Sequence, residues 1–254
     1  MAAKAYAPGE PCWAELGTSD PAAAKAFYGG VFGWSAETDP RPEAGGYTMM
    51  QLGADPVVAV SPLYAPGQQT AWNVCFATAD ADATATAAQK TGGSVLMEPM
   101  DVFDAGRFAV LADPAGAAFQ IWQPRAFRGA ARFAEPDSLG WVELATRDVE
   151  GAKRFYPELF GWSVDPSEWY TQWGLGGTDF GGMADMGDRF AAEVPPHWMP
   201  YFAVADVDAT AAKAEQAGAA TMMPPSDVTD GLRIAVLRDP QGACFGIHLH
   251  GAPH

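Results

Sequence analysis

Two short stretches of the chain repeat the same pair of side chains that could take part in proton transfer. A glutamate follows a tryptophan by two residues at Trp13 and Glu15, and again at Trp141 and Glu143. Since side chains two positions apart on a strand point to the same face, each carboxyl group is expected beside an indole ring. A carboxyl group that lines an apolar cleft can take part in proton transfer. Glu15 and Glu143 are therefore candidate catalytic residues, although each could instead bond a backbone group or an arginine.

His248 adds an imidazole to the second of these pairs. It stands in the apolar run "CFGIHLH", two residues after Gly246, and both residues should face inward on the last strand. Glu143 and His248 would then form a carboxylate–imidazole pair for proton transfer, and Gly246 would leave room for a ligand atom. This combination predicts that the second half holds the working site. The structural alternative is an exposed histidine on an edge strand.

Aromatic and amide side chains are expected to line the rest of such sites. The expected substrate-binding residues are Asn73, Gln120 and Trp122 around Glu15, together with Trp13, Trp141 and Trp198. Indole rings suit flat or polycyclic ligands by stacking, and methionines can add sulfur–aromatic contacts. An ordinary core is the competing interpretation. Trp72 and Trp198 occupy matched strand starts, which favours a shared structural role for that pair.

The chain is an internal duplication. "WAELGTSDPAAAKAFYGGVFGW" lines up with "WVELATRDVEGAKRFYPELFGW", and "RFAVLADPAGAAFQIW" lines up with "RIAVLRDPQGACFGIH". The alignment slips only between Trp34 and Trp72, and a polar, proline-containing segment around residues 124–138 joins the copies. The repeat predicts two domains, 1–127 and 128–254.

The sequence of each half predicts two structural units, each with the order strand, helix, strand, strand, strand. Asp20 is placed to cap a helix that begins at Pro21 and stops at Gly33, and Asp148 is the matching cap in the second copy. "DPAG" and "DPQG" are type I turn sequences. The aromatic residues expected to be buried between helix and sheet are Phe27, Phe32, Trp34, Phe155, Phe160 and Trp162.

The chain resembles the vicinal oxygen chelate superfamily in three features. These are the four βαβββ modules, the duplicated "FY-x-x-x-FGW" helix end and the "DP-x-G" hairpin. That superfamily includes glyoxalase I, bleomycin resistance proteins and extradiol dioxygenases, and the resemblance covers almost the full length. Within it, the sequence is most similar to the tandem glyoxalase-like proteins of actinobacteria that are often described as glyoxalases or hydroxylases. The resemblance implies an α+β fold in which four βαβββ modules form two glyoxalase-like domains, with curled mixed sheets that line clefts.

The resemblance also implies a divalent metal held by His and Glu on strands that face the cleft. The residues at the matching positions of the two halves are Trp13, Val74, Gln120, Trp141, Pro200 and Gly246. Such a site normally needs three protein ligands, and neither half keeps that pattern. We therefore expect no cofactor, and a divalent metal is not favoured.

Composition limits the partners. The 254-residue chain is 48% hydrophobic with a formal net charge of −16, so neither nucleic acid nor an anionic membrane surface is an expected partner. Three widely spaced cysteines without a CxxC pair predict free thiols, and no apolar run reaches the length of a membrane span. These features predict a cytoplasmic protein with a small-molecule ligand, as a monomer or weak homodimer.

Three functions stay open. The first is an enzyme, which the inward carboxylates favour, that uses isomerase, lyase or hydroxylase chemistry without a metal on a small apolar or aromatic metabolite. The second is a non-catalytic protein that sequesters a small molecule or antibiotic. The third is a metal-dependent glyoxalase or dioxygenase with a shifted set of ligands.

Overall fold

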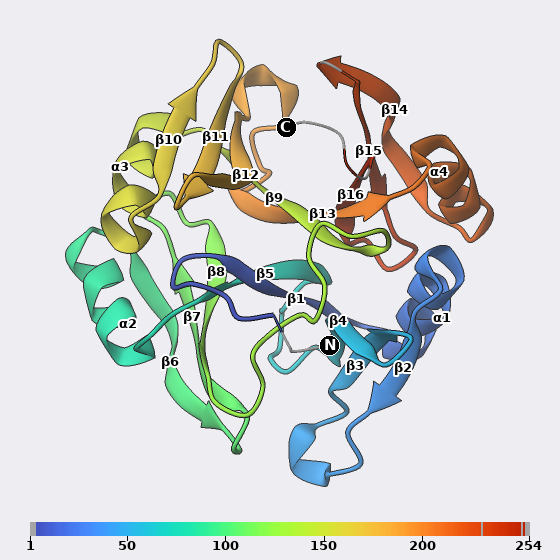
Figure 1. The fold of residues 1–254 in the computed structure, drawn as a ribbon, viewed down its shortest axis with the longest axis horizontal. Coiled ribbons are helices and arrows are strands. Elements are labelled where there is room, and N and C mark those ends of the chain that lie inside the picture. The colour runs from blue at the N-terminus through green and yellow to red at the C-terminus, as the bar shows by residue number, and fades with distance from the viewer. Residues whose placement is uncertain (1–3, 230, 250, 252–254) are drawn as a thin grey trace. The chain divides into compact units, whose positions relative to one another are not determined.

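The structure is a computed structural model that describes residues 4–229, 231–249 and 251, and it confirms an α+β fold built from four βαβββ modules (Figure 1). The elements of the first half are β1 (Pro11–Thr18), α1 (Pro21–Phe32), β2 (Ser35–Thr38), the 3₁₀ turn η1 (Pro42–Ala44), β3 (Thr48–Leu52), β4 (Asp55–Pro62), β5 (Ala71–Ala77), α2 (Ala81–Lys90), β6 (Ser94–Val102), β7 (Gly106–Ala112) and β8 (Ala118–Pro124). Those of the second half are β9 (Ser138–Thr146), α3 (Val149–Phe160), β10 (Ser163–Pro166), β11 (Tyr170–Leu175), β12 (Thr178–Asp185), the 3₁₀ turn η2 (Gly187–Arg189), β13 (His197–Val204), α4 (Val207–Gln216), β14 (Ala220–Thr229), β15 (Leu232–Arg238) and β16 (Cys244–Leu249).

The strands form two eight-stranded mixed sheets. Their orders are β2-β3-β4-β1-β5-β8-β7-β6 and β10-β11-β12-β9-β13-β16-β15-β14. In every module the first strand runs parallel to the last, as β1 does to β4 and β9 to β12, while the other strand pairs within a module are antiparallel. This arrangement follows from the connections, because a helix returns the chain to the same side whereas short turns reverse it.

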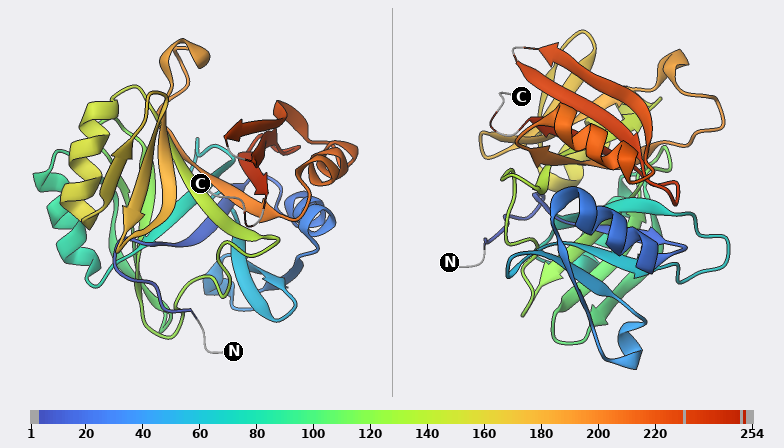
Figure 2. Two further views of the ribbon diagram at one scale, coloured as in Figure 1. Left: turned by 45° about the horizontal axis from the view of Figure 1, so that its top comes forward. Right: turned by 90° about the vertical axis from the view of Figure 1, so that its right-hand side faces the viewer.

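The chain folds into two compact units, and each combines one module from either half of the sequence. One unit contains residues 1–12, 74–129 and 142–199, with the helices α2 and α3. The other contains residues 13–73, 130–141 and 200–254, with α1 and α4. Within each unit the two helices contact each other, which Figures 1 and 2 show as neighbouring pairs. The division at residues 127 and 128 follows the sequence repeat instead, and it stays a prediction.

The expected helix caps are confirmed. The Asp20 side chain accepts a hydrogen bond from the backbone of Ala23, Pro21 is the first helical residue, and Gly33 ends α1 in the left-handed conformation. Asp148 caps α3 in the same way. Of the six aromatic residues expected inside, five are buried, and Phe160 is only partly buried at the last position of α3.

Each unit contains its own buried chain of hydrogen bonds, in which a tyrosine of one module joins its helix to a turn of the other module in the same unit. In the unit of α1, Trp72 Nε1 donates to the Tyr28 hydroxyl at 2.9 Å, and Tyr28 donates to Asp239 at 2.9 Å. In the unit of α3, Trp198 Nε1 donates to Tyr156 at 2.9 Å, and Tyr156 donates to Asp113 at 3.1 Å. Asp113 and Asp239 are the aspartates of the two predicted "DP-x-G" turns. The repeated FY and DP sequences therefore hold modules from opposite halves together.

The cysteines within the described residues are free thiols, as expected, and Cys12 and Cys75 are buried. The helices of the described residues are all too short or too polar to cross a membrane.

Candidate functional site

One face of β1 turns away from α1 and carries the first candidate carboxylate. Glu15 is the only partly exposed residue of β1, whose other positions are buried. Trp72 and Asn73 are neighbours on β5 and so point in opposite directions, and Trp72 points towards Tyr28 of α1. Asn73 therefore points to the other face, where its Nδ2 donates to the backbone oxygen of Glu15 at 3.4 Å.

The Glu15 carboxyl group is held by two hydroxyl groups. Ser61 Oγ lies 2.9 Å from Glu15 Oε1, and Tyr47 forms a second hydrogen bond with this carboxyl group. Trp13 Nε1 in turn donates to the Tyr47 hydroxyl at 3.0 Å, which fixes that ring. Burial raises the pKa of Glu15 above the ordinary value, and the hydrogen bonds from Ser61 and Tyr47 only partly oppose this effect.

The strand register surrounds Glu15 with small residues. Ala59 lies directly opposite Glu15 on β4, and Ser61 lies opposite Gly17. Met49 on β3 pairs with Ala59 and is partly exposed, so this face carries a thioether on β3 and a carboxyl group on β1, with Ala59 of β4 between them. Sequence reasoning found Glu15, Trp13 and Asn73 but missed the hydroxyl groups.

The matching face of the second half repeats part of this arrangement. Glu143 is the only partly exposed residue of β9, and it pairs with Gly182 of β12. The Tyr170 ring covers Gly182, where an added Cβ atom would lie 2.2 Å from the ring. Tyr170 immediately precedes Thr171, as Tyr47 precedes Thr48 at the matching register. The repeated Tyr-Thr pair in "YTMM" and "YTQW" was the sequence signal for these tyrosines.

The structure corrects part of the prediction for the second site. His248 is 2% exposed rather than an edge-strand surface residue, and its Nδ1 lies 3.2 Å from the backbone oxygen of Leu249. Gly246 does not leave room for a ligand atom, because an added Cβ would lie 2.1 Å from the ring of Tyr201. Tyr201 is the partner of Gly246 on the neighbouring strand. Glu143 and His248 belong to different units, and their pairing stays a prediction.

The other expected ligand contacts are placed mainly in packed surroundings. Gln120 and Trp141 are buried, and Trp122 donates to the backbone oxygen of Phe127 at 2.9 Å. Trp198 is bonded to Tyr156 within the aromatic core, as its match with Trp72 suggested. These positions favour structural roles, and their contact with a ligand stays a prediction.

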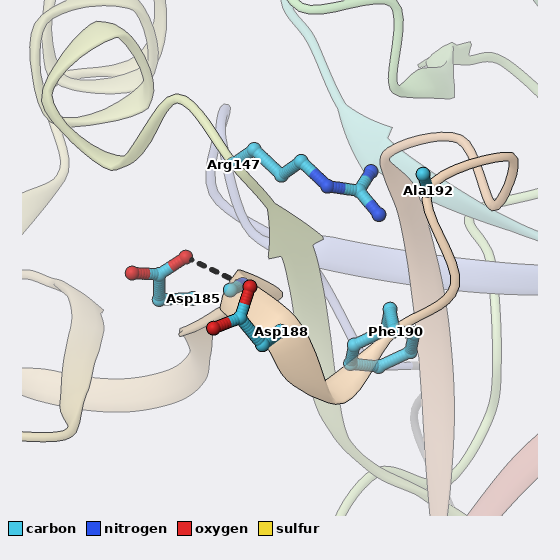
Figure 3. A pocket seen from close by; sticks show the side chains of 6 residues that line it. Arg147, Asp185, Asp188, Phe190 and Ala192 are labelled. Carbon is cyan, nitrogen blue, oxygen red and sulfur yellow. Dashed lines mark hydrogen bonds between the residues drawn. The ribbon is translucent and has the colours of Figure 1, made fainter.

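A surface pocket of about 520 Å³ lies at the end of β9. It is lined by Arg147, Asp185, Gly187, Asp188, Phe190 and Ala192 (Figure 3). The Arg147 guanidinium donates to the backbone oxygens of Ala191 and Val194 at 2.8 Å each, and Asp185 accepts from the backbone of Gly187. The arginine of this pocket holds a loop, and the carboxylates of the pocket are exposed. The partly buried, hydrogen-bonded carboxyl group of Glu15 is therefore the stronger candidate for chemistry.

The residues present do not fit the metal site that the resemblance implied. Indole rings stand at both first-strand positions, Trp13 and Trp141, and neither can ligate a metal. The place of a glutamate on the last strand is occupied by Gly246, against which the Tyr201 ring is packed. Within the described ranges, no three His, Cys, Asp or Glu side chains form a group that could hold a metal ion.

Comparisons with known proteins agree with this architecture. The sequence pattern of the Glyoxalase/Bleomycin resistance protein/Dioxygenase superfamily matches residues 12–121 and 138–247. The chain is 40% identical to the anthracycline biosynthesis protein DnrV of Streptomyces peucetius, over 95% of this chain and 94% of that protein. It is 38% identical to the putative glyoxylase CFP32 of Mycobacterium tuberculosis, over 98% of this chain and 97% of that protein.

Solved structures share the fold at low sequence identity. The Mn(II)-bound glyoxalase from Novosphingobium aromaticivorans superposes with a TM-score of 0.70 at 16% identity, covering 96% of this chain and 82% of that one. The 2,3-dioxygenase LapB from Pseudomonas sp. KL28 gives 0.68 at 11% identity, covering 99% and 96%. With the pattern matched in both halves, the chain belongs to the glyoxalase/bleomycin resistance protein/dioxygenase superfamily.

Proposed function

We propose that the protein binds a small, flat aromatic metabolite against the Glu15 face and uses Glu15 as a general acid or base, without a metal. The observation that carries this proposal is the Glu15 carboxyl group, which is held by Ser61 and Tyr47 and has a raised pKa. A carboxyl group whose pKa moves towards neutral can be present in both protonation states during turnover, which suits proton transfer.

The surroundings of Glu15 support both states of the carboxyl group. When Glu15 has given up its proton, the hydroxyl groups of Ser61 and Tyr47 stabilise the carboxylate by hydrogen bonds. When Glu15 is protonated, it can donate a hydrogen bond to a carbonyl or phenolate oxygen of a ligand. The hydrogen bond from Trp13 to Tyr47 keeps this geometry in place before the ligand arrives.

The ligand class follows from the partly exposed side chains on this face. Tyr47 directly precedes β3 and Met49 is the second residue of that strand; both are partly exposed and offer ring and sulfur–aromatic contacts to a flat ligand. The name of the Streptomyces relatives points to the same chemistry, because anthracyclines are polycyclic aromatic compounds that carry quinone and hydroxyl oxygens. We therefore propose a polycyclic hydroxyquinone or a related phenol as the ligand.

This proposal places the working site in the first half, whereas the sequence alone favoured the second. The difference rests on the hydroxyl group of Ser61, which the second half lacks. Ala184 occupies the matching position on β12, opposite Ala145 as Ser61 is opposite Gly17.

Hydroxyanthraquinones of graded substitution provide the test. Binding is followed by the thermal shift of the full-length protein, and turnover by mass analysis of products, in the wild type, Glu15→Gln and Glu143→Gln. We expect Glu15→Gln to keep binding and to lose roughly 10²–10⁴-fold in rate, while Glu143→Gln changes the rate much less. An unchanged rate in Glu15→Gln contradicts the proposal, and binding without turnover in the wild type establishes a sequestering protein.

Metal dependence is tested on the same samples. We expect the protein to contain well under one equivalent of Zn, Ni, Fe or Mn, and to keep its activity after treatment with a chelator. Activity that is lost with chelator and restored by one metal would establish a shifted metal site.

A further inference from the structure

We propose that Gln68 is a second ligand-binding residue of the Glu15 site, and that its side-chain amide donates a hydrogen bond to a carbonyl oxygen of the ligand. This role rests on the proposed function of Glu15. Gln68 belongs to the loop of residues 63–70 between β4 and β5, which lies in the same unit as Glu15. Contacts within this loop decide which end of the amide faces the site.

Two hydrogen bonds fix the orientation of the Gln68 amide. Its Oε1 accepts from the backbone N–H of Tyr64 at 2.9 Å and from that of Ala65 at 3.4 Å. Because both partners are donors, the atom that they bind must be the amide oxygen and not the nitrogen. Nε2, with its two donor hydrogens, is therefore directed away from these groups, and the described residues offer it no hydrogen-bond acceptor.

A tight turn holds the loop in this form. The backbone N–H of Gln68 donates to the backbone oxygen of Ala65 at 3.2 Å, and Gly67 has a left-handed φ of 80°. Pro66 at the second position and a glycine with positive φ at the third are typical of a type II turn. Since a backbone bond and the Gln68 side chain both close this turn, the amide is positioned before a ligand arrives.

The donor end of the amide lies on the face of β1 that carries Glu15. Glu15 and Gly17 are two residues apart on β1, and Ser61, the register partner of Gly17, bonds to the Glu15 carboxyl group at 2.9 Å. A Cβ atom added at Gly17 would lie 3.2 Å from Gln68 Nε2, so this amide occupies the side-chain space that the glycine leaves open. Two strand residues span about 6.6 Å. A ligand that gives one oxygen to Glu15 can therefore reach Gln68 with a second oxygen.

The amide complements the proton transfer proposed for Glu15. When the Glu15 carboxylate takes a proton from a phenol group of the ligand, the negative charge left behind spreads through the conjugated rings to the carbonyl oxygens. The N–H bonds of Gln68 stabilise this charge where it develops. Gln68 itself neither gains nor loses a proton, so it orients the ligand while Glu15 exchanges the proton. The site would thus prefer a hydroxyquinone to a phenol without carbonyl groups.

The second half lacks this arrangement. Ala145 stands at the position of Gly17, so a methyl group fills the space that the Gln68 amide occupies in the first half. The loop after β12 is held by the Arg147 side chain, which donates to two backbone oxygens of that loop at 2.8 Å each. Ser19 replaces this arginine in the first half, and its backbone N–H donates to Thr70 Oγ1 at 3.2 Å. A strand glycine and a loop glutamine therefore distinguish the first site from the second.

The variant Gln68→Glu separates the donor from the rest of the loop. Its carboxylate keeps oxygens that accept from the backbone of Tyr64 and Ala65, but it has no hydrogen to donate at neutral pH. Gln69→Glu is the matched control, because Gln69 is the exposed neighbour and the change in charge is the same. Backbone amide signals of Tyr64 and Ala65 in NMR spectra show whether each variant keeps the loop.

Binding is measured by absorbance titration of the full-length proteins with two probes. One is a hydroxyanthraquinone, and the other is the hydroxyanthracene with the same rings and phenol group but no carbonyl oxygens. We expect Gln68→Glu to raise the Kd of the hydroxyanthraquinone about 10-fold more than that of the hydroxyanthracene, the effect of one lost hydrogen bond. Gln69→Glu should change the two Kd values equally.

A second variant tests the same contact without touching Gln68. Gly17→Ala introduces the residue of the second half and pushes against Nε2, so it too should weaken the hydroxyanthraquinone more than the hydroxyanthracene. Equal changes for the two probes in both Gln68→Glu and Gly17→Ala overturn the role of Gln68.

The two proposals fail separately. Selective loss of hydroxyanthraquinone binding in Gln68→Glu, with turnover at the wild-type rate in Glu15→Gln, would confirm the role of Gln68 and contradict that of Glu15. Lost turnover in Glu15→Gln, with equal effects of Gln68→Glu and Gln69→Glu on binding, would contradict the role of Gln68 alone. A wild-type protein that binds neither probe contradicts both.

Discussion

Removal of the Tyr28 hydroxyl group tests the buried hydrogen bonds that hold the first module of the chain (β1–β4 with α1) to the last module (β13–β16 with α4). Tyr28→Phe keeps the ring, which packs edge-on against Trp72 with their centroids 5.2 Å apart. It removes the atom that accepts from Trp72 Nε1 and donates to Asp239, both at 2.9 Å. Tyr28 is fully buried, so water does not readily replace the lost partner.

The magnitude follows from the two groups left behind. An unsatisfied indole N–H costs about 1–3 kcal/mol, and the loss of a hydrogen bond to a carboxylate costs about 1.5–3 kcal/mol. Asp239 keeps its bonds from the backbone of Gln241 and Ala243 at 2.9 Å each, which limits the second cost. We expect Tyr28→Phe to lower the free energy of unfolding by about 3–4 kcal/mol.

The assay is urea unfolding followed by circular dichroism, with Tyr64→Phe as a control for loss of an exposed hydroxyl group. Tyr156→Phe should lose a similar amount, because it breaks the matching chain to Asp113. Burial raises the pKa of Asp113, so the folded state binds this proton more firmly than the unfolded state. The loss in Tyr156→Phe should therefore shrink as the pH falls and Asp113 becomes protonated. Losses below about 1 kcal/mol in both variants, the net value of one ordinary hydrogen bond, would refute the reasoning.

Three further outcomes are expected. Asp137 has a left-handed φ of 61° at the position where the other copy has Gly9, so Asp137→Gly should be neutral or stabilising by up to about 1 kcal/mol in urea unfolding. Gly9→Ala, by contrast, should destabilise the protein, since its Cβ would lie 3.1 Å from the Phe160 backbone oxygen, and equal effects of the two changes would contradict this. Gly246→Ala should cost about 1–3 kcal/mol because its Cβ would meet the Tyr201 ring, and a neutral result in thermal unfolding would reject that packing. The raised pKa of Glu15 means that ionising this group costs the folded state free energy, so the wild type loses stability as the pH rises from about 4 to about 8. Glu15→Gln should therefore gain stability relative to wild type over this range, by about 1.4 kcal/mol for each unit by which the folded pKa exceeds the unfolded pKa. A stability difference that does not depend on pH in paired urea titrations would show that Glu15 titrates normally.

Most of the fold could be predicted from the sequence, because the duplication repeats local signals that need no tertiary information. Asp20, Pro21 and Gly33 set the ends of α1 by capping and backbone conformation, and the structure confirms each of them. The turns at Asp113 and Asp239 were likewise expected, and in each the backbone N–H of the glycine three residues later donates to the backbone oxygen of the aspartate. The buried bonds of these aspartates to Tyr156 and Tyr28 could not be expected, because they join residues far apart in the sequence.

The site was only partly predictable for the same reason. Strand alternation placed Trp13 and Glu15 on one face, but Ser61 reaches Glu15 through the register of two parallel strands. The expectation that Gly246 leaves room for a ligand atom was wrong, because an absent side chain leaves room only where no neighbouring side chain fills it. The ring of Tyr201 does so here, and the identity of a cross-strand neighbour is not contained in the local pattern.

The measurement that tests the central claim most directly is a titration of the Glu15 carboxyl carbon by NMR, assigned with Glu15→Gln, in the free protein and with a bound hydroxyanthraquinone. We predict a midpoint above the ordinary value of glutamate in the free protein, and a further change when the ligand binds, because the ligand lies against this carboxyl group. An ordinary midpoint that the bound ligand leaves unchanged would contradict the account, since Glu15 would then be neither shifted by its surroundings nor part of the binding site.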